Sequence, residues 1–417
     1  RPRHYLHFDP PIGFKRAQRI VTSPKNVARH SFYPLISYHV TSKKLKHDKS
    51  TGVLEKKTKN RPIAYASHLD SHIYSYYASQ ISASYEKALI EKGIGDAVLA
   101  FRSLKKSNVE FAATAFEEIR KRGNCSAVAL DISGFFDNLD HELLNKSWAS
   151  IINETRLPSD HYAVFKSLTK FSSVNKELLY TKLGISLNNP KKDGRKKLCD
   201  PEAFRRDVRG NGLIETNGNA YGIPQGSPIS ALLSNVYMID FDLEARKETE
   251  KVGGIYFRYC DDMLFIVPTE YKNRVAGFAR RKIKELRIDI NPDKTELRDF
   301  REVKGVISCD KPLQYLGFTY DGKQILIRST ALARYSEKMK RGVRLAKSTM
   351  RKRNRARIKR GESPKQLYRQ EIYKRYSHLG KRNFIRYGML AAHIMSSNAI
   401  KKQLKPLWAR LIKEIET

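Results

Sequence analysis

The chain has 417 residues, and its 80 Lys and Arg against 43 Asp and Glu give a formal net charge of +37. An excess of this size requires an anionic partner, and phosphate backbones are the commonest one, so a nucleic acid is expected. No run of about 18 apolar residues points to a membrane instead.

The length predicts roughly two or three subdomains around a shared cleft. The four cysteines lie apart without paired spacing, so neither a disulfide framework nor a zinc knuckle is indicated. Arg1 to Pro11 lacks the apolar segment of a secretory signal. A reducing cytoplasm is therefore the expected location.

In the N-terminal part, prolines and a basic run at Lys43–Lys59 predict an irregular arm and a turn-rich lobe. A helix is expected over 67–92, where apolar residues recur every three or four positions. A second helix begins at a capping box formed by Ser107 and Glu110 and ends at Gly123.

The spacing of the apolar residues then changes from that of a helix to that of a strand. Ala127–Ile132 is a short apolar run that includes Asp131, as in a buried strand that presents a carboxylate at its tip. Helices are expected at 141–152 and 160–170. The interval 172–221 is polar and basic with many Gly and Pro, so we interpret it as an insertion or long loop.

Ser227 and Pro228 open a helix that is expected to run to about Glu248. Two apolar runs, 255–259 and 263–267, predict a hairpin with acidic residues at its tight end. The elements expected after it are a helix at 269–286, a strand at 288–290, and a hairpin of 313–320 with 323–327 around Asp321 and Gly322.

The last 90 residues are predicted to be helical and basic. Between Ala331 and Arg360 there are 13 Lys or Arg and one acid, Glu337. Tyr335 and Met339 still lie on an apolar face, so this segment is expected to pack against a body and present its cations outward. A charge run is usually a solvated face, but this density favours phosphate binding.

Three aspartates carry the candidate chemistry. Asp131 ends a predicted strand, and Asp261 and Asp262 lie in the tip of a predicted hairpin. If the strands are neighbours, about 4.8 Å apart, their tips lie within reach of bridging metal ions. Phosphoryl transfer from a nucleoside triphosphate uses two Mg²⁺ ions about 4 Å apart, held by such carboxylates. We expect Asp131 and Asp261 to be direct ligands and Asp262 to assist them.

An Asp-Asp pair in a hairpin is by itself most often a solvated turn. Here the apolar runs on both sides of the pair would bury the hairpin. Buried carboxylates are electrostatically costly without a cation, and the neighbours therefore favour a metal site.

Five segments in order resemble the palm motifs of reverse transcriptases. They are Val128–Leu139 (VALDISGFFDNL), Gly222–Ser230 (GIPQGSPIS), Phe257–Val267 (FRYCDDMLFIV), Lys294–Leu297 (KTEL) and Leu316–Phe318 (LGF). The resemblance covers about residues 55–325. The motifs FFDN and PQGSPIS are similar to those of the bacterial group II intron and retron-like branch. The compact chain resembles the defence-associated members of this branch, class two among them.

The resemblance implies an α+β right-hand polymerase. The fingers would span 1–120 with an N-terminal arm, the ferredoxin-like palm 121–328 with the 172–221 insertion, and the basic helical thumb 329–417. Two features depart from the family pattern. The interval from Asp131 to Gly222 is long, and Cys260 stands where the family more often has Ala, Met or Val.

The resemblance also implies roles for single residues. Phe136 matches the steric gate that excludes a 2′-hydroxyl, although a core aromatic is an equally good interpretation. Gln225 matches the residue that contacts nucleotide and template, and Lys59 with Arg61 matches the cations that grip the triphosphate. Ile132 belongs to the implied metal site with the three aspartates.

Lys294 matches the lysine proposed to protonate the pyrophosphate, although a solvated surface lysine is a strong alternative. Leu316 and Gly317 resemble the primer grip, unless Gly317 only marks a strand bend. The thumb cations Lys340, Arg341 and Arg344 would bind nucleic acid.

The sequence thus predicts an RNA-directed DNA polymerase that uses deoxynucleoside triphosphates and two Mg²⁺ ions, for which Mn²⁺ can substitute. A structured noncoding RNA is the expected template, DNA the product, and antiphage defence the expected role. Two alternatives stay open: an RNA-binding maturase or chaperone whose palm is a scaffold, and an untemplated DNA polymerase. The oligomeric state is not predicted.

Overall fold

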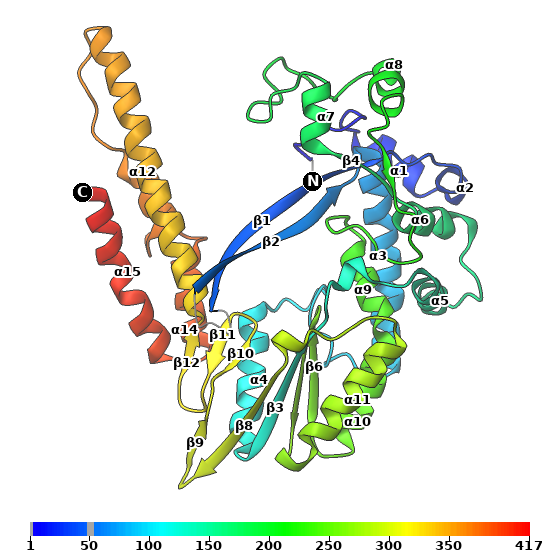
Figure 1. The fold of residues 1–417 in the computed structure, drawn as a ribbon, viewed down its shortest axis with the longest axis vertical. Helices are drawn as coiled ribbons and strands as arrows, with labels where there is room; N and C mark the ends of the chain where they lie inside the picture. Colours follow the sequence, from blue (N-terminus) through cyan, green and yellow to red (C-terminus); the bar gives the residue numbers. More distant parts are fainter. Residues whose placement is uncertain (1–2, 48–53) are drawn as a thin grey trace.

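The computed structural model describes residues 3–47 and 54–417, in which three β-sheets are surrounded by helices (Figure 1). One sheet lies at the base of the molecule, the second in an upper lobe, and the third beside the C-terminal helices. Part of the N-terminal basic run, 48–53, lies outside the described residues. The mixed composition of helices and sheets confirms the predicted α+β class.

The sheet at the base has five antiparallel strands in the order β6-β7-β3-β8-β9. Its central strand, β3, pairs with β7 in a register that places Asp131 opposite Asp262. The predicted strand and hairpin are thereby confirmed as neighbours. The strands are β3 (Cys125–Asp131), β6 (Ile255–Tyr259), β7 (Asp262–Val267), β8 (Glu296–Val303) and β9 (Val306–Cys309).

Both faces of this sheet are covered, which explains why its central strands are apolar at nearly every position. Val128 and Phe265 belong to the core on the side of α9, α10 and α11. Ala127 and Leu264 belong to the other core, which they share with α4 and the C-terminal helices. The helices are α4 (Asn108–Arg122), α9 (Ser230–Tyr237), α10 (Ile239–Glu250) and α11 (Lys272–Glu285).

The N-terminal part is more regular than expected. The basic run lies in a long antiparallel hairpin and not in an irregular arm, because the backbone of β1 pairs with β2 along most of its length. Helix α3 and the pair α5 and α6 confirm three predictions. The elements are α1 (Phe14–Val21), α2 (Pro24–Ala28), β1 (Leu35–His47), β2 (Leu54–Tyr65), α3 (His68–Glu91), η1 (Phe135–Asp137), α5 (His141–Ile151) and α6 (Ser159–Thr169).

The interval 172–221 is a folded lobe, and the expectation of a long loop is wrong. Its strand β4 pairs in parallel with β1, so the lobe extends the upper sheet. Phe204 and Val208 share a small core with Leu6 and Phe8 of the N-terminal arm. The sequence hid this core because its apolar residues are spread over distant segments. The elements are β4 (Ser172–Asn175), α7 (Lys176–Lys182), α8 (Pro201–Ala203), η2 (Phe204–Arg209) and β5 (Glu215–Thr216).

Three further predictions need correction. The helix expected over 227–248 is divided at Met238 into α9 and α10. The strand expected at 288–290 is reduced to an isolated bridge between Ile290 and Ile132. The helix expected from Thr269 begins with a 3-10 turn, η3 (Thr269–Tyr271), and continues as α11. Another 3-10 turn, η4 (Pro292–Lys294), precedes β8.

The C-terminal part is helical, as predicted, and begins with a small sheet. The segment expected as one strand over 313–320 is two strands joined at Leu316 and Gly317, whose φ angles are +46° and +95°. The elements are β10 (Leu313–Tyr315), β11 (Phe318–Tyr320), β12 (Ile325–Ile327), α12 (Ser329–Lys359), α13 (Arg369–Tyr376), α14 (Phe384–Ile394) and α15 (Asn398–Glu416).

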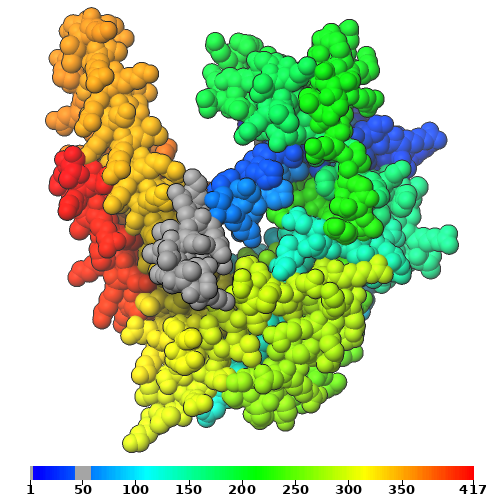
Figure 2. Space-filling model, in the orientation of Figure 1, coloured from blue at the N-terminus to red at the C-terminus, as the bar shows by residue number. Residues whose placement is uncertain are grey.

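A hollow opens above the five-stranded sheet, between α12 on one side and the upper lobe on the other (Figure 2). Tyr335, Met339 and Val343 are the buried residues of α12, and its outer half rises beyond the body of the molecule. Within the described ranges, no helix is both long and apolar enough to cross a membrane.

Candidate active site

The three predicted aspartates gather at one edge of the five-stranded sheet, where it faces the hollow. Asp131 ends β3, Asp262 begins β7, and Asp261 lies in the tight turn between β6 and β7. The backbone N–H of Ile132 donates to the carbonyl of Asp261 at 3.2 Å, which ties the turn to the end of β3. Directly opposed residues on antiparallel strands have Cβ atoms about 5 Å apart. The strand register therefore brings the carboxylates together.

The negative charges at this edge are only partly compensated. Burial raises the pKa of Asp131, and the Lys294 ammonium opposes this shift. Burial and the charges of Asp261 and Asp131 together raise the pKa of Asp262 to about 7. Neighbouring carboxylates that disfavour one another's charge are the setting in which a bound cation is most favourable.

Lys294 lies directly against Asp131. Its Nζ is 2.6 Å from both carboxylate oxygens. The same segment is fixed by its backbone, because the N–H of Asn291 donates to the carbonyl of Asp131 at 2.7 Å. The lysine is 45% exposed, so its ammonium faces the hollow while holding the buried carboxylate.

The donor set fits a hard divalent cation, because carboxylate oxygens are the ligands that Mg²⁺ prefers. In the described part of the chain, no three His, Cys, Asp or Glu side chains already converge as a metal site. Lys294 engages both oxygens of Asp131, and a cation at Asp131 would take over at least one of them. Ile132 has a buried apolar side chain and could contribute only its backbone carbonyl.

The Gly222–Gly226 loop lies beside the aspartates and is held on both sides. The N–H of Ile223 donates to the carbonyl of Phe136 at 2.9 Å, and the N–H of Ala64 on β2 donates to the carbonyl of Gln225 at 2.7 Å. Gly226 has a φ of +107°, and a Cβ there would lie 2.6 Å from the Ala64 carbonyl oxygen. Only glycine fits this approach of loop to strand.

Gln225 and Lys59 lie near the same edge. The Gln225 side chain hydrogen-bonds the carboxylate of Asp137, whose pKa is raised by burial and lowered by the charge of Lys59. Lys59 also lowers the pKa of Asp131, so its charge acts on the acidic cluster. Arg61 is exposed two residues along β2, and this spacing places it on the same face of the strand as Lys59.

Phe136 is partly buried and packs against the core beside the fully packed ring of Phe135, with ring centroids 5.7 Å apart. Both interpretations of Phe136 are compatible with this position, because the ring has a packed side and an accessible side. Cys260 adopts a left-handed φ of +60° and packs against the same core. Burial raises the pKa of its thiol, which argues against a nucleophile.

Leu316 and Gly317 form the turn between β10 and β11 in the three-stranded sheet. This turn lies near the acidic edge, because burial and the charge of Asp262 raise the pKa of the adjacent Tyr315. The Asn108 side chain donates to the carbonyl of Leu316 at 2.8 Å and to the Tyr387 hydroxyl at 2.9 Å. The N–H of Arg328 donates to the carbonyl of Gly317 at 3.1 Å. The turn is thus fixed from α4 and from the start of α12.

The three predicted nucleic-acid-binding cations, Lys340, Arg341 and Arg344, lie on α12 and are exposed. They lie on the opposite side of the helix from its buried residues, as the periodicity predicted. Arg344 also contacts Glu414 of α15 at 3.0 Å. These residues are not brought into the acidic cluster but line a separate, basic surface.

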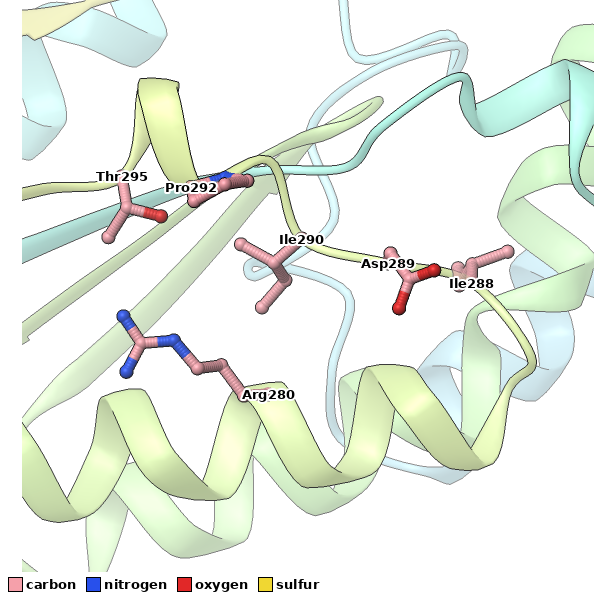
Figure 3. Close-up of a pocket in the computed structure, with 6 residues that line it drawn as sticks. All are labelled: Arg280, Ile288, Asp289, Ile290, Pro292 and Thr295. Atoms are coloured by element: carbon pink, nitrogen blue, oxygen red, sulfur yellow. The ribbon is translucent and has the colours of Figure 1, made fainter.

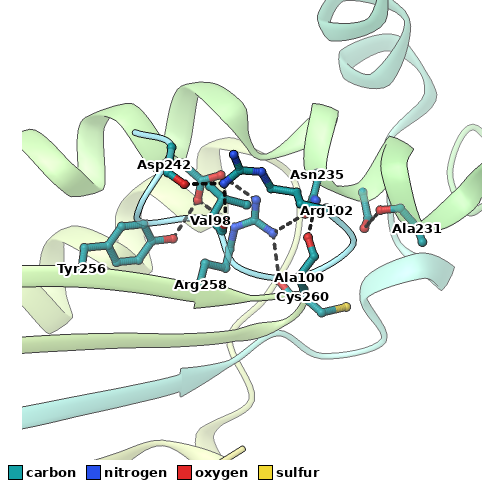
Figure 4. Close-up of polar contacts among 11 residues, drawn as sticks. Val98, Ala100, Arg102, Ala231, Asn235, Asp242, Tyr256, Arg258 and Cys260 are labelled. Atoms are coloured by element: carbon teal, nitrogen blue, oxygen red, sulfur yellow. Dashed lines mark hydrogen bonds and ion pairs between the residues drawn. The ribbon is translucent and has the colours of Figure 1, made fainter. Parts of the chain in front are cut away.

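Two groups of the site were missed in the sequence. Asp137, in the FFDN segment, contacts Gln225, and Arg258 on β6 lies beneath the acidic turn in a polar network (Figure 4). An arginine inside an otherwise apolar strand was the available signal for Arg258. A strand residue of this kind usually needs a buried acidic partner, but the sequence does not reveal which one.

A cavity of about 360 Å³ lies on the α11 side of the segment that carries Lys294 (Figure 3). Arg280 of α11 projects toward it from below, and Asp289, Ile290 and Pro292 line its upper side. The N–H of Ser133 donates to the carbonyl of Asp289 at 2.8 Å. The cavity is therefore separated from the acidic cluster by the segment itself.

Carboxylates at the ends of adjacent antiparallel strands, helices on both faces of the sheet and a hollow bounded by a basic helix together define a right-hand polymerase. Residues 46–320 match the family described as reverse transcriptase (RNA-dependent DNA polymerase). The chain belongs to this family. No curated protein matches the chain.

Solved structures with a similar arrangement include yeast telomerases. A telomerase from Candida tropicalis, truncated of its C-terminal domain, has 10% identity and a TM-score of 0.41, with 70% of this chain and 57% of that chain covered. The apo telomerase from the same organism has 12% identity and a TM-score of 0.43, and the match covers 71% of this chain and 50% of that chain.

The telomerase of Candida albicans in complex with a fragment of telomeric RNA has 11% identity, a TM-score of 0.42, and 95% and 66% covered. The chain thus spans between half and two thirds of the length of these proteins. Such distant similarities support no statement about function.

Proposed function

We propose that this chain is an RNA-directed DNA polymerase that joins deoxynucleotides by two-metal phosphoryl transfer at Asp131, Asp261 and Asp262. The observation that carries the proposal is the register of β3 and β7, which opposes Asp131 to Asp262 beside a turn that holds Asp261. Bound divalent metal would activate the attacking hydroxyl and neutralise the charge of the leaving pyrophosphate.

The chain's own residues bind and orient the nucleotide. Lys59 and Arg61 share a face of β2, with the charge of Lys59 acting on the acidic cluster, which suits a grip on the triphosphate. The contact with Asp137 holds the Gln225 side chain in place. In this position Gln225 can contact the base pair that is being formed. Lys294 lies against Asp131. From this position its ammonium can donate a proton to the departing pyrophosphate.

The nucleic acid lies in the hollow between the upper lobe and α12. The Leu316–Gly317 turn offers a backbone without a bulky side chain at Gly317, where a primer strand can approach closely. Lys340, Arg341 and Arg344 follow on α12 and suit contacts to phosphates of the duplex. Residues 1–120, 121–328 and 329–417 act as fingers, palm and thumb.

The finer assignment is to the bacterial group II intron and retron-like branch, which the FFDN and PQGSPIS motifs support. For this chain we propose a structured noncoding RNA as the template and antiphage defence in the cytoplasm as the biological role. The net charge of +37 is compatible with such a polyanionic partner.

Replacing Asp131 by Asn tests the proposal. The amide keeps the size of the side chain and its place against Lys294 but removes the charge that holds a cation. Primer extension on an RNA template is expected to fall by about 100- to 1000-fold, the range typical for loss of one electrostatic group at a reaction centre. Thermal unfolding and RNA affinity are expected to stay close to those of the wild type.

The scaffold alternative makes the opposite prediction. A maturase or chaperone whose palm only supports RNA would keep its biological activity after Asp261→Ala and Asp262→Ala. The buried carboxylates repel one another, which favours the enzyme interpretation. A protein that only supports RNA would gain nothing from this acidic edge, because its negative charges would repel the RNA. The untemplated alternative is decided by the sequence of the product.

A further inference from the structure

Arg258 lies fully buried on β6, three residues before Asp261, and every nitrogen of its guanidinium is engaged (Figure 4). Its Nε and one terminal nitrogen contact the two carboxylate oxygens of Asp242 on α10 at 2.7 and 2.6 Å. The other terminal nitrogen donates to the Asn235 side-chain oxygen at 3.0 Å and to the Cys260 carbonyl at 3.1 Å. One side chain therefore connects two helices to the acidic turn.

A buried ion pair is weak evidence for stability. Its desolvation cost often exceeds the attraction, and replacing both partners by apolar residues is frequently neutral or stabilising. Asp242 has a 0% exposed side chain and also accepts from the Tyr256 hydroxyl at 2.8 Å. A fully buried network with this many polar contacts points to a role in geometry. The bond from Arg258 to the Cys260 carbonyl indicates that this role is to position the acidic turn.

The Cys260 carbonyl belongs to the peptide bond that leads into Asp261. Cys260 has a left-handed φ of +60°, which is uncommon for a residue other than glycine and costs backbone energy. The bond from Arg258 holds this peptide from inside the core, and the Ile132 N–H holds Asp261 from the other side at 3.2 Å. These two contacts fix the backbone on both sides of the Asp261 Cα and therefore the point from which its side chain projects.

The same network continues toward the Gly222–Gly226 loop. Asn235 lies on α9, and its amide donates to the Ala100 carbonyl at 2.9 Å. At the start of α9, the Ser230 hydroxyl donates to the Pro224 carbonyl at 2.7 Å. Helix α9 is thus anchored to the loop at one end and to Arg258 near the other.

We propose that Arg258, with Asp242 and Asn235, is a positioning unit that sets the acidic turn relative to the Gly222–Gly226 loop. It makes no contact with substrate and acts through the Cys260–Asp261 peptide. The proposal rests on the polymerase function proposed above and adds the device that aligns the carboxylates with the nucleotide. A displacement of about 1 Å at a reacting centre can lower a rate by about 100-fold.

Arg258→Lys is the first test. Lysine keeps the charge that pairs with Asp242, but a single ammonium lacks the planar fork that also reaches Asn235 and the Cys260 carbonyl. We expect a folded protein whose kcat for primer extension falls by about 100-fold. The Mg²⁺ concentration for half-maximal rate should rise, while the Kd for primer and template stays within about twofold of the wild type.

The double variant Arg258→Met with Asp242→Leu separates positioning from stability. It removes both charges, so no unpaired ion is left in the core, and the melting temperature is expected to be near that of the wild type. The same loss of kcat and the same shift in Mg²⁺ dependence are expected, because the Cys260 carbonyl loses its donor.

The matched control is the pair Lys272 and Asp299, which closes the opposite end of the same sheet, where Asp299 also accepts from Ser126 at 2.6 Å. Lys272→Met with Asp299→Leu should leave kcat and Mg²⁺ dependence unchanged. If either Arg258 variant melts like the wild type and keeps kcat within about threefold, the positioning role is wrong. An inactive wild type would instead contradict the proposed function, so the two failures are distinguishable.

Discussion

Asp131 and Asp262 face each other across β3 and β7, yet their charges are balanced differently. Asp131 has the Lys294 ammonium against both of its oxygens. Burial and two acidic neighbours raise the pKa of Asp262 to about 7. The protein therefore maintains a pair of carboxylates of which one is already neutralised by a cation. The uncompensated charge lies on the side of the acidic turn.

Phe136 is the residue for which a substitution is most informative. Its ring packs against the core on one side, and its backbone carbonyl holds the loop that carries Gln225. If the accessible side of the ring meets the sugar, Phe136→Ala should raise incorporation of ribonucleotides by at least about tenfold relative to deoxynucleotides. Single-nucleotide extension with each triphosphate measures this ratio.

Phe135→Leu is the control for that experiment, since Phe135 is buried beside Phe136 and its loss disturbs only packing. It should lower the melting temperature without changing the choice of sugar. Unaltered sugar selectivity in Phe136→Ala would mean that the ring is a core aromatic and that another group excludes the 2′-hydroxyl.

Among the elements, the upper lobe is held to the N-terminal arm by His7. The His7 imidazole is buried, and the Phe8 N–H donates to its Nδ1 at 2.9 Å. The backbone carbonyl of His7 accepts from the Leu198 N–H at 2.8 Å. Burial, reinforced by the charge of His68, lowers the pKa of His7 to about 3. A neutral His7 is therefore required where arm and lobe meet.

This depressed pKa predicts a loss of local stability in acid. The unfolded arm takes up a proton near pH 6.5 and the folded arm only near pH 3, so stability falls as pH decreases below about 6.5. The protection factors of the amides in residues 6–8 and 198–208, which correct for the slower intrinsic exchange in acid, should fall from pH 6.5 toward pH 4. In His7→Gln this pH dependence should be absent, and an equal dependence in both proteins would assign it to another group.

The outer half of α12 is a second element with a testable role. Beyond Val343 the helix has no buried residue, and five of its exposed cations have no ion-pair partner among the described residues: Arg351, Lys352, Arg353, Arg355 and Lys359. Like charges three or four residues apart repel one another along a helix. A phosphate backbone would relieve this repulsion.

Replacing these five residues by Gln should weaken binding of a primer–template duplex and make its salt dependence shallower. The slope of log K against log salt should fall by about 0.9 for each phosphate that the helix no longer neutralises. The matched control replaces five exposed cations in the region of α1 and α2, far from the hollow: Lys15, Arg16, Arg19, Lys25 and Arg29. If both sets change the slope equally, only net charge matters and α12 does not bind the duplex specifically.

For the whole molecule, the sequence predicted the elements whose signals are local. The capping box of Ser107 and Glu110 is present in α4, and the apolar period of α3 is present in its buried stripe. The acidic edge was also predicted, because the apolar runs beside Asp131, Asp261 and Asp262 indicated buried strands whose carboxylates need a cation. Their meeting is confirmed by the register of β3 and β7.

What the sequence could not predict depends on contacts between distant segments. The core of the upper lobe joins Phe8 to Phe204, and no periodicity links residues so far apart. The same holds for Arg258, whose charge is balanced by Asp242 on another element. The basic hairpin of β1 and β2 was misinterpreted because its prolines and cations resemble those of an irregular arm, although backbone pairing stabilises it.

The central claim is tested most directly by extending a DNA primer on an RNA template of defined sequence, with deoxynucleotides and Mg²⁺, and sequencing the product. We expect DNA that is complementary to the template. Product of random sequence, or extension that continues when the template is omitted, would contradict RNA-directed synthesis by this chain.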